Sequence, residues 1–349
     1  MTAVATPEVQ AADEEVLAPL DEVADLAPHS PARGVLIALG RGLAIAVPVL
    51  FLTTLITFAL GAFSDQDPAA AVLGEVATPA DVERMRHEFG LDRPFHEQYG
   101  SWVWNALHGD LGASWFTNIP VADSIAERLP VSLSVAGLAL GIAVVLGGCG
   151  GIVAALNRGR FVDRAITAVA AAITTVPAFV AGIGLIIVFA VLIPVFPTGG
   201  YVPISAGIGL WASFLVLPAF ALGLDASADL ARQLRTGLVS ALDENYVLGA
   251  QVRGLPWRRV VLVHALRNGA APAIAVIGLH IPRLVGGAVI TEAVFQMPGL
   301  GQLTRDAALR GDVPVIQGSL LVAVLLVLVS SLVVNVVLAR LLPASERAA

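Results

Sequence analysis

The stretch from Asp243 to Arg259, DENYVLGAQVRGLPWRR, interrupts a chain that is otherwise strongly hydrophobic. It is the centre of a longer arginine-rich break between Asp225 and Gly269. Membrane proteins keep such basic loops on the cytoplasmic side of the bilayer. We expect the loop to form short helices broken at Gly254, a shape suited to being held by another protein. On a bundle of spanning helices, such a surface indicates a channel-forming subunit that a separate soluble protein drives.

The composition is that of a membrane protein. The chain has 349 residues, of which 57% are hydrophobic and 13% charged, and its mean hydropathy is +0.83. Several apolar runs reach the ~20 residues that a helix needs to cross about 30 Å of hydrocarbon. The net charge of −7 arises from acids in residues 8–25 and 65–127. These values differ strongly from those of a soluble domain.

Two residue types limit the chemistry of this chain. It contains no lysine, which excludes a phosphate-binding loop because that loop needs a lysine on the β- and γ-phosphates. If ATP powers the protein, another chain must bind it. The only cysteine, Cys149, lies in an apolar, glycine-rich run and excludes a disulfide framework. We therefore expect no catalytic residues, no metal site and no cofactor in this chain.

The hydrophobic runs predict an all-α polytopic membrane protein. Residues 1–33 are acidic, unlike a signal peptide, and predict a disordered cytoplasmic tail. The fourth span is short, and the fifth is interrupted by His280, Pro282 and Arg283. Six transmembrane helices are predicted, at about 35–62, 130–156, 165–195, 207–225, 271–292 and 315–342.

The arginines set the orientation of these spans. If the N-terminus is inside, thirteen arginines fall in cytoplasmic segments, which is the side where they concentrate in membrane proteins. Both termini are therefore predicted to be cytoplasmic. Only six arginines fall outside, namely Arg84, Arg86, Arg93, Arg128, Arg305 and Arg310.

The segment 63–129 is predicted to be a helical extracytoplasmic insertion after the first span. Thr78, Pro79 and Asp81 provide an N-cap, a proline at the first helical position and an acid three residues after the cap. This helix should end near Gly90, and a second should run from Pro94 to about residue 107. The insertion should form a small cap on the bilayer, and a docking surface for a substrate-delivery protein is compatible with it.

Four stretches together carry a family resemblance. The loop from Glu244 to Pro272 resembles the cytoplasmic "EAA" loop of binding-protein-dependent ABC importer permeases, and most closely the B-type permease of the dipeptide, oligopeptide and nickel group. Residues 89–99 (FGLDRPFHEQY), 109–130 and 292–301 (EAVFQMPGLG) match the same group in the same order. The resemblance covers about residues 35–342.

The resemblance implies a fold and a set of partners. The fold would be a type I ABC importer transmembrane domain over 130–342, with a cytoplasmic coupling loop at 226–270. The partners would be a second homologous permease, two ABC ATPases that bind ATP and magnesium, an extracytoplasmic substrate-binding protein and membrane lipid, but no nucleic acid. The chain would be a multi-pass protein of the bacterial cytoplasmic membrane and would work by alternating access.

The coupling helix would lie at about 246–252 in a cleft of the ATPase. Gly254 would end it in a left-handed conformation, and Leu248 stands where many importers carry a glutamate. The arginines could pair with partner acids or only fix topology against anionic lipid. The residues expected to couple are Tyr246, Gly249, Ala250, Arg253, Gly254, Leu255, Arg258 and Arg259.

Polar residues in the fifth span are candidates for the transport pathway. His280 and Arg283 share a helix face and lie ~14–18 Å beyond Ala271, near mid-membrane. A charge at that depth faces a polar cavity or a partner. Arg283 could pair with an acid of the second permease, because no acid of this chain is clearly expected at that depth, or it could attract a peptide carboxylate. Glu292 is the third candidate.

The substrate is the least determined feature. Peptides are the commonest cargo of the group that the chain resembles, and nickel chelates and glutathione-type compounds are alternatives. No cluster of His, Cys or Met favours direct metal handling. An intramembrane protease lacks its nucleophile and base, and a channel or secondary transporter has no need of the long basic loop. A scaffold without transport would not need a buried charge such as Arg283.

Overall fold

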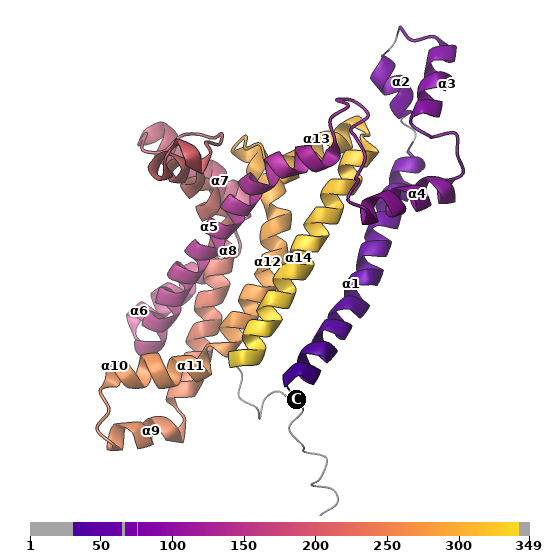
Figure 1. Cartoon of the computed structure of the whole chain (residues 1–349). Helices are drawn as coiled ribbons and strands as arrows, with labels where there is room; N and C mark the ends of the chain where they lie inside the picture. Colours follow the sequence, from indigo (N-terminus) through magenta and orange to yellow (C-terminus); the bar gives the residue numbers. More distant parts are fainter. Residues whose placement is uncertain (1–30, 65–66, 75, 342–349) are drawn as a thin grey trace, which may run out of the picture. The chain divides into compact units, whose positions relative to one another are not determined.

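A computed structural model describes residues 31–64, 67–74 and 76–341. These residues are almost entirely helical (Figure 1), and among them the only strand-like contact is one bridge between Ala113 and Pro120. The predicted tail 1–33 lies almost wholly outside the described residues. The helices are α1 (Pro31–Ala62), α2 (Pro68–Leu73), α3 (Pro79–Glu88), α4 (Phe95–Leu107), α5 (Val121–Leu156), α6 (Phe161–Ile173), α7 (Ala178–Ile186), η3 (Ile187–Leu192), η4 (Ile204–Ala206), α8 (Ile208–Leu242), α9 (Asn245–Val252), α10 (Trp257–Arg259), η5 (Val260–Ala265), α11 (Leu266–Gly269), α12 (Ala271–Val294), α13 (Leu300–Arg310) and α14 (Val313–Leu341).

The chain divides into two compact units, Met1–Pro48 and Val49–Ala349, so the boundary lies within α1. Four of the helices contain a segment long and apolar enough to cross a membrane, namely α1, α5, α8 and α14. Two helix pairs pass the same test only when taken together, and they bend by 101° at residues 174–177 and by 53° at residue 270. The all-helical membrane fold is confirmed. The described helices support between four and six spans, so the count of six stays a prediction.

Two predicted boundaries differ from the structure. The helix expected to end at residue 225 continues as α8 to Leu242. Its 35 residues measure about 52 Å at ~1.5 Å per residue, which exceeds ~30 Å of hydrocarbon. Residues after Asp225 are rich in Ala, Leu and Arg, which favour helix. The first part of the loop expected at 226–270 is therefore helical, and the irregular segment begins at Asp243.

Proline positions explain the other differences. The polar residues His280, Pro282 and Arg283 do not break the fifth span, because α12 runs from Ala271 to Val294 as one helix that contains Pro282. The third span, expected to be continuous over 165–195, turns sharply before Pro177 instead. A proline at a helix start needs no N–H partner and disfavours helical backbone in the residue before it, so Pro177 opens α7 and ends α6.

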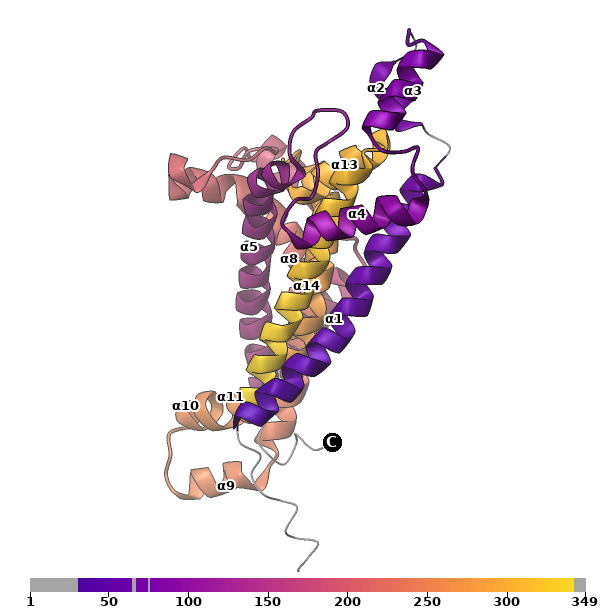
Figure 2. The ribbon, with the colours of Figure 1, turned by 45° about the vertical axis from the view of Figure 1, so that its right-hand side comes forward.

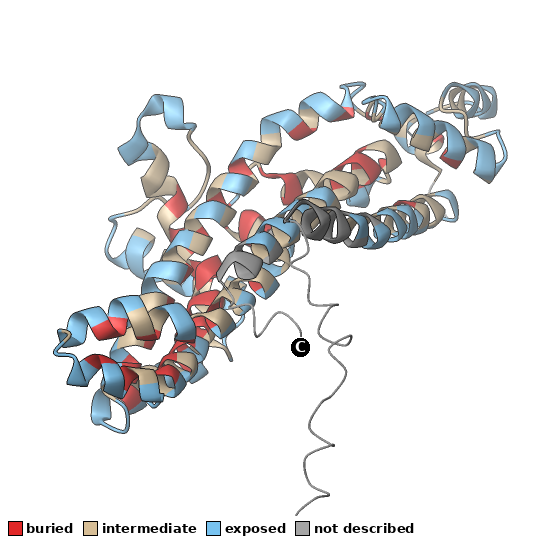
Figure 3. Cartoon of the chain, turned by 60° about the horizontal axis from the view of Figure 1, so that its bottom comes forward, coloured by how far each residue is buried: buried red, intermediate tan, exposed pale blue. Residues whose placement is uncertain are grey.

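Glycines bring α5 and α8 into close contact. A Cβ atom on Gly147 would lie 2.6 Å from the carbonyl oxygen of Ser227, and one on Gly223 would lie 2.6 Å from that of Ala139. Small residues allow helix backbones to approach closely in membranes. Buried residues line the helix sides that face other helices, whereas most outward faces are exposed (Figure 3). This packing fixes the heights of α5 and α8 relative to each other.

A second close contact joins α8 to the segment that follows the basic loop. A Cβ on Gly237 would lie 2.2 Å from the carbonyl oxygen of Gly269, and one on Gly269 would lie 2.7 Å from that of Gly237. The C-terminal part of α8 also holds α6, because Arg235 Nη2 donates to Asp163 Oδ2 at 2.7 Å, and Arg235 Nε donates to Asp163 Oδ1 as well. The segment that follows the basic loop therefore contacts α8 directly.

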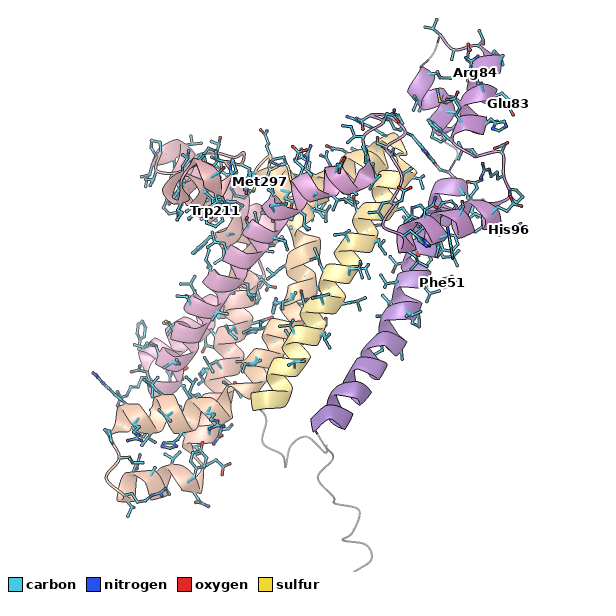
Figure 4. The ribbon with its side chains drawn as sticks, viewed as in Figure 1. Phe51, Glu83, Arg84, His96, Trp211 and Met297 are labelled. Atoms are coloured by element: carbon cyan, nitrogen blue, oxygen red, sulfur yellow. The ribbon has the colours of Figure 1, made fainter. Side chains whose placement is uncertain are left out.

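The two helices predicted between residues 78 and 107 are confirmed as α3 and α4. Thr78 and Asp81 form a capping box at the start of α3, and hydrogen bonds from Thr78 lower the pKa of the Asp81 carboxyl. Gly90 adopts a φ of 69° after α3, and α4 ends at Leu107. Figure 4 labels Arg84 on α3 and His96 on α4, both of which are exposed.

Candidate functional site

The basic loop folds as a short helix, a turn and a second helix. In Figures 1 and 2, α9, α10 and α11 gather at one end of α8, and α13 lies at the opposite end. The turn after α9 is made by Gly254, which has a φ of 75°. Its N–H donates to Gln251 O at 2.8 Å, and Leu255 N–H donates to Ala250 O at 3.2 Å. The predicted left-handed break at Gly254 is confirmed.

One face of α9 packs inside the loop. Val247 and Ala250 are buried against Val260, and the partly buried Tyr246 and Leu255 complete this small core. Ala250 was predicted as a coupling residue, but the structure places its side chain in this core, away from any partner. Tyr246 is also turned inward, and its hydroxyl is buried without a hydrogen-bond partner among the described residues.

The opposite face of α9 is open and apolar. Leu248 is 60% exposed and Val252 is 88% exposed, and Trp257 at the start of α10 is also exposed. Two large apolar side chains on one short helix, left uncovered by the described residues, are typical of a contact site for another protein. The sequence reasoning missed these three residues as contacts. The four-residue spacing of Leu248 and Val252, which puts them on one helix face, could have revealed two of them.

Glycines and arginines that the sequence predicts as coupling residues surround this apolar face. Gly249 and Gly254 are exposed, so a partner backbone can approach them closely. Arg253 is exposed and folds back, with its Nε donating to Gly249 O at 3.0 Å. The structure therefore brings the apolar side chains and a basic rim together on one surface, which we call the coupling surface. It comprises Leu248, Gly249, Val252, Arg253, Gly254, Trp257, Arg258 and Arg259, all of them exposed.

A second polar group lies between α8 and α12. His280 is 3% exposed, and its Nε2 lies 3.0 Å from Asp229 Oδ2, while its Nδ1 lies 3.9 Å from Asp225 Oδ2. The expectation that this chain offers no acid at the depth of His280 is therefore wrong. It failed because the span was expected to end at residue 225, which put Asp225 at its edge and Asp229 outside it. Arg283 is exposed and makes no ion pair within the described part of the chain.

Glu292, the third pathway candidate, is fully buried in a structural position. Ser132 Oγ donates to its Oε1 at 2.6 Å, and the N–H of Gln302 donates to its Oε2 at 3.0 Å. The same serine accepts from Leu300 N–H at 2.8 Å, so both side chains cap the first turn of α13. A Cβ on Gly299 would lie 2.1 Å from the carboxyl carbon of Glu292. The structure thus ties α12, α5 and α13 together through Glu292.

The end of the bundle that holds α13 also contains an apolar core. Phe295 and Met297 follow Glu292 and are fully buried, with Trp211 of α8 packed against the same cluster. Figure 4 shows Trp211 and Met297 at the same end of the bundle. The connection from α12 to α13 is therefore a packed element, which explains why the EAVFQMPGLG stretch combines an acid, large apolar residues and glycines.

Known proteins resemble almost the whole chain. Residues 147–347 match the family described as the binding-protein-dependent transport system inner membrane component, and residues 36–136 match the N-terminal part of such membrane components. A Brucella abortus protein that carries the name of a peptide transport system permease is 39% identical over 282 residues, which cover 80% of this chain and 90% of that protein.

Two further relatives extend the comparison. The probable peptide ABC transporter permease of Sinorhizobium fredii is 36% identical over 294 residues, covering 84% of this chain and 94% of its own length. The glutathione transport system permease GsiC of Escherichia coli is 36% identical over 298 residues, covering 85% and 95%. The N-terminal family segment precedes the main one along the chain, and the described helices include apolar segments long enough to cross a membrane. The chain therefore belongs to the family of inner membrane components of binding-protein-dependent transport systems.

Proposed function

We propose that this chain is the B-type permease subunit of an ATP-driven importer for di- or oligopeptides. The observation that carries the proposal is the coupling surface, an apolar helix face with a basic rim at one end of a family-typical membrane bundle. A helix face of this kind fits an apolar groove on a partner protein. The partner would be an ABC ATPase that supplies the nucleotide site, since this chain has no lysine for a phosphate loop. ATP and magnesium would therefore be held by partner chains.

The contact between Gly237 and Gly269 supports a route from the coupling surface to the spans. The backbones of α8 and α11 touch there, so a displacement of α9 and α10 moves the inner end of α8 as well. The importer would comprise this chain, a second homologous permease, two ATPases and an extracytoplasmic binding protein. Its spans would alternate between inward and outward openings without covalent chemistry.

The substrate class rests on the relatives. Proteins named as peptide permeases and as a glutathione permease align with this chain over at least 80% of its length. Glutathione is itself a tripeptide, so both names indicate short peptides with free charged ends. An importer of nickel chelates, the alternative from the sequence, has no such support among these relatives.

Reconstitution tests the proposed function. The four kinds of subunit would be purified as one complex, placed in proteoliposomes and supplied with radiolabelled trialanine. We expect uptake that requires ATP and the binding protein, together with ATP hydrolysis that is absent when this chain is purified alone. Stoichiometric ATP binding to this chain alone, or failure to copurify with an ATPase, would refute the proposal.

A labelling prediction tests the orientation, with both termini inside. Cysteines at His96 and Gln251, in a Cys149→Ser background, are expected to react differently with an impermeant thiol reagent in intact cells. Both positions are exposed, so access depends only on the side of the membrane. His96 should react and Gln251 should react only after permeabilisation. The reverse pattern would invert the proposed topology.

A further inference from the structure

Asp225 is the least satisfied member of the charged group between α8 and α12. Asp229 binds His280 through one oxygen and accepts from Arg232 through the other. Among the described residues, Asp225 has only the 3.9 Å approach of His280 Nδ1, which is too long for a hydrogen bond, and its side chain is 45% exposed. The group therefore contains one carboxylate that is free to bind something from outside this chain.

The depth of Asp225 follows from the close contacts of α5 and α8. Gly223 meets Ala139 and Ser227 meets Gly147, so Asp225 lies level with residues between 139 and 147. These are the middle of the run 130–156 of α5, which contains no charged residue. Asp225 therefore lies near the centre of the hydrocarbon layer, where a carboxylate needs water or a counter-charge.

Arg283 lies at the same depth on α12. The two helices are antiparallel, and Gly287 faces Leu222 while His280 faces Asp229. Arg283 lies between Gly287 and His280, so it is level with Asp225 or a neighbouring residue. It is exposed and makes no ion pair or hydrogen bond within the residues that the structure describes. One acid and one base thus stand at mid-membrane without a partner from this chain.

The chemistry of the group favours an organic cation over a metal ion. Asp225, Asp229 and His280 have possible metal ligands within 4.8 Å of one another. However, the two imidazole nitrogens face different carboxylates, and the Arg232 guanidinium already binds Asp229. A metal ion bound to one imidazole nitrogen and these carboxylates would be repelled by the Arg232 guanidinium. An ammonium group needs only acceptors on one side, which Asp225 supplies.

We propose that Asp225, supported by Asp229 and His280, binds the α-ammonium group of a peptide at mid-membrane, and that Arg283 receives the peptide carboxylate. The site would bind zwitterionic peptides by both charged ends, on the face of α8 and α12 that would line the pathway. The proposal rests on the peptide import proposed above and adds the groups that recognise the two peptide ends. Charge-assisted hydrogen bonds of this kind are about twice as strong as neutral ones.

The first test compares peptides with free and blocked amino groups in the reconstituted importer. Uptake of trialanine and of N-acetyl-trialanine would be expressed, for each variant, relative to the unmodified importer with the same peptide. This ratio removes the binding protein's own preference. Asp225→Asn is expected to lower trialanine uptake about tenfold and to leave the acetylated peptide nearly unchanged. Asp225→Glu should retain most uptake, and Asp306→Asn, at a half-buried acid on α13 outside the group, should behave like the unmodified chain.

The corresponding test of Arg283 concerns the carboxylate end of the peptide. Arg283→Gln is expected to slow uptake of trialanine much more than uptake of trialanine amide. Equal loss of both peptides, or loss of assembly, would instead indicate an ion pair with an acid of the second permease. An Asp225→Asn importer that transports trialanine at the normal rate would overturn the ammonium site, while peptide import itself would stand.

A second measurement does not require transport. Gly286 is exposed, with free space where a Cβ would lie, so Gly286→Cys in the Cys149→Ser background reports on the same depth. In permeabilised membranes it should react with a water-soluble methanethiosulfonate, and trialanine should slow that reaction. Protection should disappear in the Asp225→Asn variant. An unreactive cysteine, or protection that persists without Asp225, would overturn the proposal even if no peptide uptake were found.

Discussion

Replacing Glu292 with alanine is expected to destabilise the folded chain by several kcal/mol. The carboxyl group accepts from the Ser132 hydroxyl and from the first turn of α13, where Gln302 donates at 3.0 Å. Each buried donor that loses its acceptor costs about 1–3 kcal/mol. The substitution also leaves a cavity under Gly299, which lies against this carboxyl group. The measurement is the aggregation temperature of the detergent-purified protein, together with its level in the membrane.

Two variants make this prediction specific. Glu292→Gln keeps one acceptor and the shape, so its loss should be smaller. Glu127→Ala removes an exposed acid on α5 and should have no measurable effect. If Glu292→Ala kept normal stability but lost peptide uptake, the structural role would be refuted and Glu292 would return as a pathway residue.

Replacing Gly254 with valine is expected to lower peptide uptake at least about tenfold while the ATPases continue to hydrolyse ATP. The φ of 75° at this position is poorly accessible to a β-branched residue, at a cost of about 1–3 kcal/mol. Relief of that strain would displace α9 relative to α10 and misalign the coupling surface. Uptake and ATP hydrolysis would be measured side by side in the reconstituted complex.

Gly254→Asn is the matched control. No atom lies within 4 Å of the place where a Cβ would stand, so backbone conformation alone decides the outcome. Asparagine tolerates positive φ better than valine, and its variant should retain much of the coupling. Full coupled activity in Gly254→Val would show that this turn does not position the coupling helix. Uncoupling by both variants would instead point to direct contact between Gly254 and the ATPase.

Features with a short-range cause could be predicted from the sequence. The start of α3 follows from Thr78 and Asp81, three residues apart, and the turn after α9 follows from Gly254 itself. Apolar runs predicted membrane helices because hydrocarbon requires every backbone group to bond within its own segment. The order of four short motifs indicated the family, which the comparisons confirm over 80% of the chain.

Features that depend on distant contacts could not be predicted in the same way. Asp229 and His280 are 51 residues apart, and α8 had to extend past residue 225 before they could meet. Ala250 has the small side chain of a contact residue, but its burial against Val260 depends on how α9 folds onto η5. Glu292 lies in an apolar span, where a pathway acid would also lie. Only the folded chain brings Ser132, 160 residues earlier, within hydrogen-bond distance of its carboxyl group.

The sequence by itself thus determined the membrane class, the helical insertion signals near residues 78–107, the basic loop with its break at Gly254, and the family. These depend on composition and on neighbours within a few residues, where capping, glycine geometry and hydrophobic length act. Tertiary contacts were needed to show that Glu292 anchors α13, that Asp225 and Arg283 lie at the same level of α8 and α12, and that Leu248 and Val252 form the open face of the loop. The reason is physical, because burial and charge pairing are set by which helices touch, and those contacts join residues that no local pattern connects.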